Sequence, residues 1–284
     1  MSTPILPLSG PSSSTNSRGR WGQSNGFGGS TGRGLGIELD VEDELRFGRG
    51  GIPLILRRLV KFRSMDFELA FWQLTYLVVA PRRVYKQTYH HKQTKNQWAR
   101  DDPAMLLLIA GCLAVSGIAW SLVYQFPPST LITLPLLMIF RDFLLPSLVI
   151  ASILYFISNR LLLAPSLPNA STSDNRVEFA YSFDVAVNAF FPAWLTVGVG
   201  LLGLGMVVVK DNWVCLWVGN TLFLVAQVQY VYVTYLGYAA LPFVARSQLL
   251  LSPLLPIFGG YLLSLLGFNI AKHALEYYFG KSWN

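Results

Sequence analysis

The sequence has few of the residues that build metal, cofactor or covalent catalytic sites. Its 284 residues include two cysteines and three histidines. Cys112 and Cys215 both fall in apolar stretches, and no Cys/His group has the spacing of a zinc site. Ser, His and Asp are scattered without the pattern of a catalytic triad. We therefore expect no disulfide framework, no metal, no cofactor and no enzymatic activity.

Charge is also scarce, and it is distributed unevenly. Only 13% of the residues are charged, against about 25% in ordinary soluble domains. Hydrophobic residues make up 52% of the chain, and its mean hydropathy is +0.43. Fifteen of the 22 Lys and Arg residues precede residue 104, where long apolar stretches begin. This split predicts an all-α polytopic transmembrane helical bundle with a basic cytosolic N-terminal region.

Three regions follow from the composition. Residues 1–50 are Gly/Ser-rich and then acidic, which predicts a disordered tail. Residues 51–103 form a basic cytosolic or interfacial helical region, and residues 104–284 a five-span transmembrane domain. The predicted spans lie at about 104–124, 131–157, 189–209, 213–236 and 249–271.

The apolar stretch at 65–80 is too short to cross a bilayer, which needs about 20 residues. Basic clusters flank it: residues 57–100 hold ten Lys and Arg against two acids, a net charge of +8. Such a helix fits one that lies in the cytosolic membrane interface. It equally fits one that packs beneath the bundle, and the two arrangements are compatible.

The connecting loops predict the orientation. Basic residues are concentrated before the first span and, in smaller numbers, between spans two and three and between spans four and five. The N-terminus should therefore be cytosolic, and five spans place the C-terminus in the lumen. Asn169 begins a glycosylation sequon in the loop 159–188. On the cytosolic side this sequon should stay unmodified.

Two ionisable residues, Arg141 and Asp142, lie near the middle of the predicted second span. Charges at that depth are costly, which makes them a functional hypothesis. As sequence neighbours on a helix they should point about 100° apart and pair poorly with each other. We expect partners on other spans, with the candidates Asn188, Asn220, Gln227 and Gln229. These two residues could belong to an ion or proton pathway, or to a polar network that stabilises helix packing.

A basic, aromatic face at 82–103 precedes the first span. Its candidate partner-binding or membrane-surface residues are Arg82, Arg83, Lys86, Lys92, Lys95, Trp98, Arg100, Asp101 and Asp102. The Lys and Arg residues suit the anionic cytosolic leaflet, and nucleic acid is a less economical partner for a juxtamembrane segment. Attraction to lipid alone does not explain the acids, which favour a protein contact or an N-terminal cap on span one beside Pro103.

Several segments resemble the Unc-fifty (uncoordinated-fifty) family of small Golgi multispanning membrane proteins. They are KQTKNQWARDDPA at 92–104, FISN at 156–159, YSFDVAVNAFFP at 181–192, VGNTLFLVA at 218–226 and YVYVTYLGYAALPF at 230–243. The resemblance runs in order from about residue 55 to the end of the chain.

The resemblance implies five spans, a cytosolic N-terminus and residence in the Golgi membrane or the related endoplasmic reticulum. It also implies a role in vesicle-mediated protein transport, with a large Arf guanine-nucleotide exchange factor and cell-surface receptor cargo as expected partners. Two hypotheses follow. The first is a non-enzymatic trafficking adaptor. The second is a transporter or lipid-handling protein that uses Arg141 and Asp142.

Overall fold

The computed structural model describes residues 66–86, 98–100, 103–163 and 176–279. The predicted tail at 1–50 therefore lies outside the described residues. Five helical segments are long and apolar enough to cross a membrane, as the hydropathy predicts. They cover Ala104–Val123, Thr130–Leu162, Phe179–Val208, Trp213–Ala239 and Ser247–Ser264. The described part of the chain contains no strand, so the all-α prediction is confirmed for it.

The first span is a single helix, α5 (Ala104–Val123), and the fourth is α10 (Trp213–Ala239). The second span is built from three pieces and a short end: α6 (Thr130–Leu137), η2 (Met138–Leu144), α7 (Leu145–Ile157) and η3 (Ser158–Leu162). The third is α8 (Phe179–Trp194), η4 (Leu195–Val199) and α9 (Gly200–Val208). The fifth begins with η5 (Ser247–Leu251) and continues as α11 (Leu254–Ser264).

Two of the wider π-helical stretches follow prolines. Pro135 lies inside α6, shortly before η2, and Pro192 lies inside α8, shortly before η4. A proline has no N–H to donate, and its ring crowds the preceding turn. One wider, π-helical turn relieves this steric crowding. These spans are therefore widened at the prolines, while their helical φ and ψ values continue through the junctions.

The third and fifth spans differ most from the predicted bounds. The third begins at Phe179, ten residues before the predicted start, because the first half of α8 includes the polar residues Ser182 and Asp184. The fifth ends at Ser264, before the predicted end at 271. Gly267 there has φ +134°, a conformation that side-chain-bearing residues rarely adopt. The chain turns at this point into a separate helix, α12 (Ile270–Phe279).

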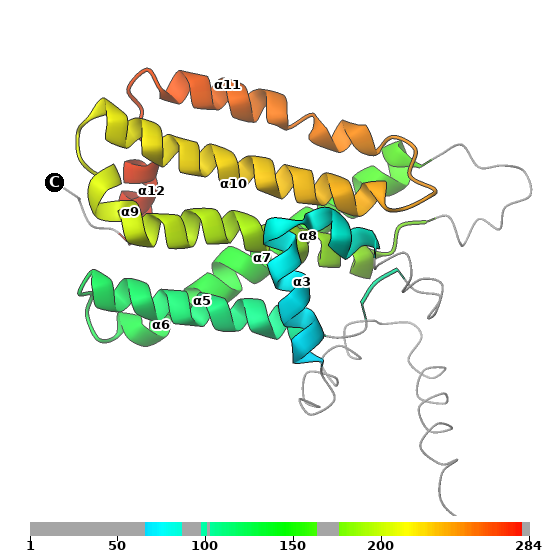
Figure 1. Cartoon of the computed structure of the whole chain (residues 1–284), viewed down its shortest axis with the longest axis horizontal. Coiled ribbons are helices and arrows are strands. Elements are labelled where there is room, and N and C mark those ends of the chain that lie inside the picture. Colours follow the sequence, from blue (N-terminus) through cyan, green and yellow to red (C-terminus); the bar gives the residue numbers. More distant parts are fainter. Residues whose placement is uncertain (1–65, 87–97, 101–102, 164–175, 280–284) are drawn as a thin grey trace, which may run out of the picture. The chain divides into compact units, whose positions relative to one another are not determined.

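The spans alternate in direction, so the connections gather at two ends of the bundle (Figure 1). We call one the basic end; it carries Trp98–Arg100, Leu163 and Val244. We call the other the α12 end; it carries the 124–129 and 209–212 connections and α12. The most extensive helix contacts join α8 to α10 and α7 to α8, so α8 is the central helix of the bundle.

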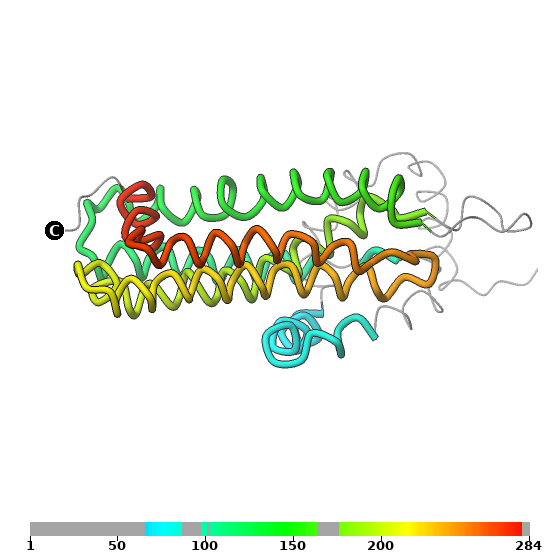
Figure 2. Tube along the Cα trace, turned by 90° about the horizontal axis from the view of Figure 1, so that it is seen from above, coloured from blue at the N-terminus to red at the C-terminus, as the bar shows by residue number. Residues whose placement is uncertain are grey.

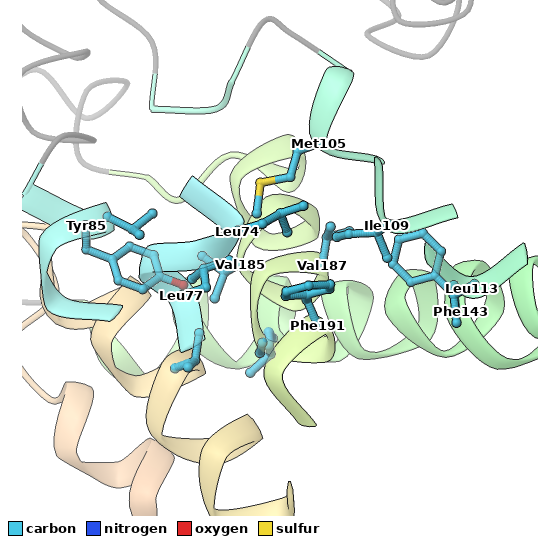
Figure 3. Packing of buried hydrophobic residues seen from close by; sticks show 14 of the residues in the cluster. Leu74, Leu77, Tyr85, Met105, Ile109, Leu113, Phe143, Val185, Val187 and Phe191 are labelled. Carbon is cyan, nitrogen blue, oxygen red and sulfur yellow. The ribbon is translucent and has the colours of Figure 1, made fainter. Parts of the chain in front are cut away.

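The short helix α3 (Phe67–Val79) does not run with the spans. It crosses them, upright in Figure 1 and seen nearly end-on in Figure 2. Its buried residues Leu74 and Leu77 point toward Met105 of α5 and Val185 of α8 (Figure 3). The helix is therefore packed on the side of the bundle, toward the basic end.

Candidate functional site: the basic end and the intramembrane ion pair

Helix α3 is apolar on two faces. One face packs on the bundle, while the opposite face exposes Phe71 (62%), Trp72 (52%) and Val79 (76%). A helix that crosses the spans and presents large apolar side chains outward suits the headgroup–acyl boundary of a bilayer. The structure thus shows the predicted packing of this helix on the bundle. Its place in the cytosolic membrane interface stays a prediction, which the exposed apolar face favours.

The residues after α3 place positive charge next to that apolar face. Residues 81–86 are helical, and Arg82, Arg83 and Lys86 are exposed. Arg82 donates from Nε to the Tyr232 hydroxyl of α10 at 2.9 Å. The Arg83 guanidinium lies over the Tyr76 ring, 5.6 Å from its centroid. Lys86 is exposed, and its side chain has no hydrogen bond or ion pair with the residues that the structure describes.

Two buried side chains fix this basic segment on the bundle. Val84 is 1% exposed and Tyr85 4% exposed. The Tyr85 hydroxyl faces the Asn188 amide of α8, although the two lack the geometry of a full hydrogen bond. Burial raises the pKa of the Tyr85 phenol, so this group stays neutral at physiological pH.

Trp98 belongs to the core of the basic end. It is 6% exposed and packs edge-on against Tyr181 of α8 and Phe243, with ring centroids 6.4 and 5.9 Å apart. The prediction that Trp98 is presented at the surface before span one is therefore wrong. A tryptophan between basic residues in the sequence is typical of a surface position. The pocket that buries Trp98 is formed by residues distant in the sequence, so it is visible only in the fold.

Arg100 is anchored through its backbone. Its N–H donates to Asp184 Oδ2 of α8 at 2.7 Å, and its guanidinium contacts the Met105 sulfur. Asp184 was not singled out from the sequence, where it looked like part of a polar loop. Pro103 occupies the position directly before α5 and provides no side-chain cap to it. Lys92, Lys95, Asp101 and Asp102 lie outside the described residues.

Hydrogen bonds between aromatic residues and their neighbours join α8 to α10 at this end. The Tyr181 hydroxyl donates to the Gly237 carbonyl at 2.6 Å, and the Tyr238 hydroxyl donates to Ser182 Oγ at 3.0 Å. The Tyr181 and Tyr238 rings meet edge-on at 6.2 Å. These bonds satisfy buried polar groups, which rigidifies the helix pair that carries the basic segment.

The remaining connections of the basic end are also bonded to one another. Asn159 exchanges two hydrogen bonds with the backbone of Val177, at 3.0 and 3.1 Å. Leu163 and Val244 form an isolated antiparallel bridge, and the Ala245 N–H donates to the Leu162 carbonyl at 3.1 Å. The end of the second span thus contacts both the start of the third span and the connection between the fourth and fifth spans.

The intramembrane pair differs from its prediction. Arg141 Nε and Asp142 Oδ1 are 2.7 Å apart, and Nη2 reaches Oδ2 at 3.3 Å. The expectation that these neighbours point away from each other is therefore wrong. Both lie in the π-helical stretch η2, where each residue turns the chain less than in an α-helix, so consecutive side chains come closer together.

The expected partners of this pair are also wrong. Asp142 accepts a hydrogen bond from the Tyr278 hydroxyl of α12, and the Arg141 guanidinium lies 4.7 Å from the Tyr278 ring centroid. The pair is only partly buried, with side chains 46% and 29% exposed. Within Thr130–Leu162 it lies near the middle, displaced toward the α12 end. Tyr278 was missed because α12 was not predicted as a helix.

Three of the other predicted polar residues, Asn188, Asn220 and Gln229, lie in contacts between helices. Asn220 is fully buried and donates to Ser264 Oγ and the Phe268 carbonyl while accepting from the Ile270 N–H, at 2.8–2.9 Å. Asn188 is 3% exposed, next to Tyr85. Gln229 accepts from Thr196 at 2.7 Å. Asn220 therefore ties the fourth span to the turn that begins α12.

No group of three or more His, Cys, Asp or Glu residues in the described ranges could hold a metal ion. The charged and polar groups of the basic end are used for packing or face outward. What this end offers chemically is a fixed basic and apolar surface, which suits binding.

Comparison with known proteins agrees with these features. The UNC-50 family model matches residues 55–279. A fission yeast protein (Schizosaccharomyces pombe) named "Protein GMH1 homolog" is 40% identical over 225 residues, covering 79% of this chain and 96% of the relative. The bovine "Protein unc-50 homolog" is 42% identical over 225 residues, covering 78% and 85%. The zebrafish protein of that name is also 42% identical, covering 78% and 86%. No solved structure matches. The chain is a member of the UNC-50 family and a membrane protein of several spans.

Proposed function

We propose that this protein is a non-enzymatic adaptor of the Golgi and early secretory membranes. Its basic end faces the cytosol, recruits a large Arf guanine-nucleotide exchange factor and thereby supports transport of cell-surface receptors. The C-terminus lies in the lumen. The resemblance of the chain to its family suggests this role, and one structural observation carries it: the exposed cations Arg82, Arg83 and Lys86 are fixed beside the apolar outer face of α3.

The physical argument starts from the membrane. With Phe71 and Trp72 in the cytosolic leaflet, the residues that follow α3 emerge at headgroup depth. Each Lys or Arg near an anionic leaflet contributes about 1 kcal/mol, so three cations hold this segment against the surface. Because Tyr85 and Val84 anchor the same segment to the bundle, the cations keep a fixed position. An acidic patch on a cytosolic protein would find both a preformed basic surface and a membrane there.

The test uses the two cations of this segment for which the described residues show no hydrogen bond to the bundle. The double variant Arg83→Gln with Lys86→Gln should reduce capture of an Arf exchange factor on liposomes that contain the full chain. Arg82 is left intact because it bonds to Tyr232. The matched control is Lys210→Gln at the α12 end, which should capture normally. If the double variant captures the exchange factor as well as wild type, recruitment occurs elsewhere on the protein. Arg246→Gln then tests the connection between the fourth and fifth spans.

A transport role for Arg141 and Asp142 has less support. Tyr278 covers the pair from α12, and the two charges satisfy each other. The groove between α10 and α11 is lined by neither of them. These contacts favour a structural role, which the Asp142 substitution described below separates from transport.

A further inference from the structure

The fifth span lies at the edge of the bundle. In Figure 1, α10 separates α11 from the other spans, and α10 is the helix with which α11 makes its main contact. Only 11% of the fifth span, Ser247–Ser264, is buried. Large side chains such as Leu255 (81% exposed) and Leu263 (69%) face outward. A span with so little protein contact has a face available to another membrane component.

Polar contacts hold α11 to α10 near the α12 end. Asn220 donates to Ser264 Oγ at 2.9 Å, and the Thr221 hydroxyl lies 3.1 Å from the Tyr261 hydroxyl. The two helices also leave a groove of about 530 Å³ between them. Its lining includes Leu224, Gln227, Pro256 and Gly260. A Cβ added at Gly260 would meet nothing within 4 Å, so the groove has open space at that residue.

Gln227 is the unusual residue of this groove. It is exposed and lies at the middle of α10, hence near the middle of the bilayer. Within the part of the chain that the structure describes, its amide has no hydrogen-bond partner. Gln229, two residues on, is by contrast bonded to Thr196. An amide without a hydrogen-bond partner in hydrocarbon costs free energy. A molecule that both donates and accepts hydrogen bonds in this groove would remove that cost.

We infer that the groove between α10 and α11 is the dimer interface of this protein, in which Gln227 pairs with Gln227 of a second copy. Two copies inserted in the same direction are related by a two-fold axis along the membrane normal. Rotation about such an axis leaves the depth of each residue in the bilayer unchanged. A residue near the axis therefore lies opposite the same residue of the second copy. A glutamine amide has both a donor and an acceptor, and two of them form reciprocal hydrogen bonds.

The depth of Gln227 favours a second copy over a lipid. Acyl chains fill an apolar groove but carry no hydrogen-bonding group at the bilayer centre, so they would leave the amide unsatisfied. The exposed apolar residues of α11 provide van der Waals contact around the pair, and the open space at Gly260 allows close approach of a facing helix.

The experiment measures energy transfer between labelled full-length chains in liposomes of increasing lipid-to-protein ratio. Wild-type protein should dimerise. Gln227→Leu removes the amide from both copies and therefore both hydrogen bonds, which should weaken dimerisation about eightfold. Gln227→Asn, which keeps an amide, should restore part of the affinity.

A second variant tests the groove independently of the amide. Gly260→Trp adds an indole to the groove at a position where a Cβ meets nothing within 4 Å, and it should abolish dimerisation. Gly203→Trp on α9 is the matched control, because that exposed glycine is equally open, and it should dimerise normally. A monomeric wild type, with or without a lipid retained in the groove, overturns the inference. Unchanged dimerisation in both Gln227→Leu and Gly260→Trp overturns it as well.

Discussion

The Tyr278 hydroxyl donates a hydrogen bond to the Asp142 carboxylate, 136 positions earlier in the chain. This contact joins α12, the helix that follows the fifth span, to the second span. The Tyr278 ring also covers the Arg141 guanidinium. One side chain thus meets both members of an ion pair that lies within a membrane-spanning segment.

Replacing Tyr278 with Phe removes the hydroxyl and keeps the ring over Arg141. A hydrogen bond to a charged acceptor contributes about 1.5–3 kcal/mol, and partial exposure of Asp142 favours the lower end. We expect a loss of about 1.5 kcal/mol in the free energy of unfolding, measured by denaturation of the purified full chain. Tyr277→Phe, at a site 94% exposed, is the control and should unfold like wild type. Equal stability of the two variants would contradict the contact.

The same contact predicts a response to alkaline pH. Burial, and then the hydrogen bond to Asp142, raise the pKa of Tyr278 above the ordinary value of about 10. Below pH 10 the phenol is protonated in both states, and its contribution is fully present. Above about pH 10 the unfolded chain ionises first, so the advantage of wild type over Tyr278→Phe should shrink by up to about 1.4 kcal/mol per pH unit. A constant difference between about pH 8 and pH 11 would refute this assignment.

Asp142→Asn separates a structural from a transport role for the ion pair. It leaves the Arg141 guanidinium without a charged partner, so folding in the membrane should suffer more than in Tyr278→Phe. We expect reduced protein abundance and retention in the endoplasmic reticulum, measured by immunoblotting and imaging. A variant that is abundant and correctly located but inactive would favour transport instead.

The close contact of α8 with α10 depends on Gly237. A Cβ at this position would lie 2.8 Å from both methyl groups of Val185 and 3.2 Å from the Tyr85 ring. Gly237→Ala should therefore separate the helices and cost about 1–3 kcal/mol of unfolding free energy. Gly203→Ala, where a Cβ meets nothing within 4 Å, should be neutral or stabilising by up to about 1 kcal/mol. Similar stability of the two variants would mean that this packing is unimportant.

The orientation can be tested at both ends of the chain. Tags at the N- and C-termini should be protease-accessible and protease-protected, respectively, in intact microsomes. The Asn169 sequon, which lies outside the described residues, should carry no glycan, whereas a sequon appended after Asn284 should be modified. An endoglycosidase-sensitive glycan on native Asn169 would reverse the proposed topology.

The number of spans was predictable because each apolar stretch is long and nearly free of charge. The start of the third span was not, because the first half of α8 contains polar residues whose partners come from elsewhere in the chain. Asp184 accepts from the Arg100 backbone, and Ser182 accepts from Tyr238. Hydropathy cannot count such bonds, so it places the boundary later.

The candidate site was predictable in its charge and only partly in its geometry. Arg82, Arg83 and Lys86 are exposed, as a basic juxtamembrane segment requires. Trp98 has the same sequence context but is buried, because its pocket is formed by the distant residues Tyr181 and Phe243. The contact between Arg141 and Asp142 depends on a π-helical turn, which the α-helical 100° spacing does not represent.

The fold of α12 also sets an order of events during biosynthesis. The ribosome completes this helix after all five spans, so Arg141 and Asp142 enter the membrane before Tyr278 exists. Until then the ion pair and the Asn220 amide lack the groups that α12 and its preceding turn supply. A nascent chain arrested before residue 268 therefore lacks these hydrogen bonds, and the polar groups within its spans are left without them.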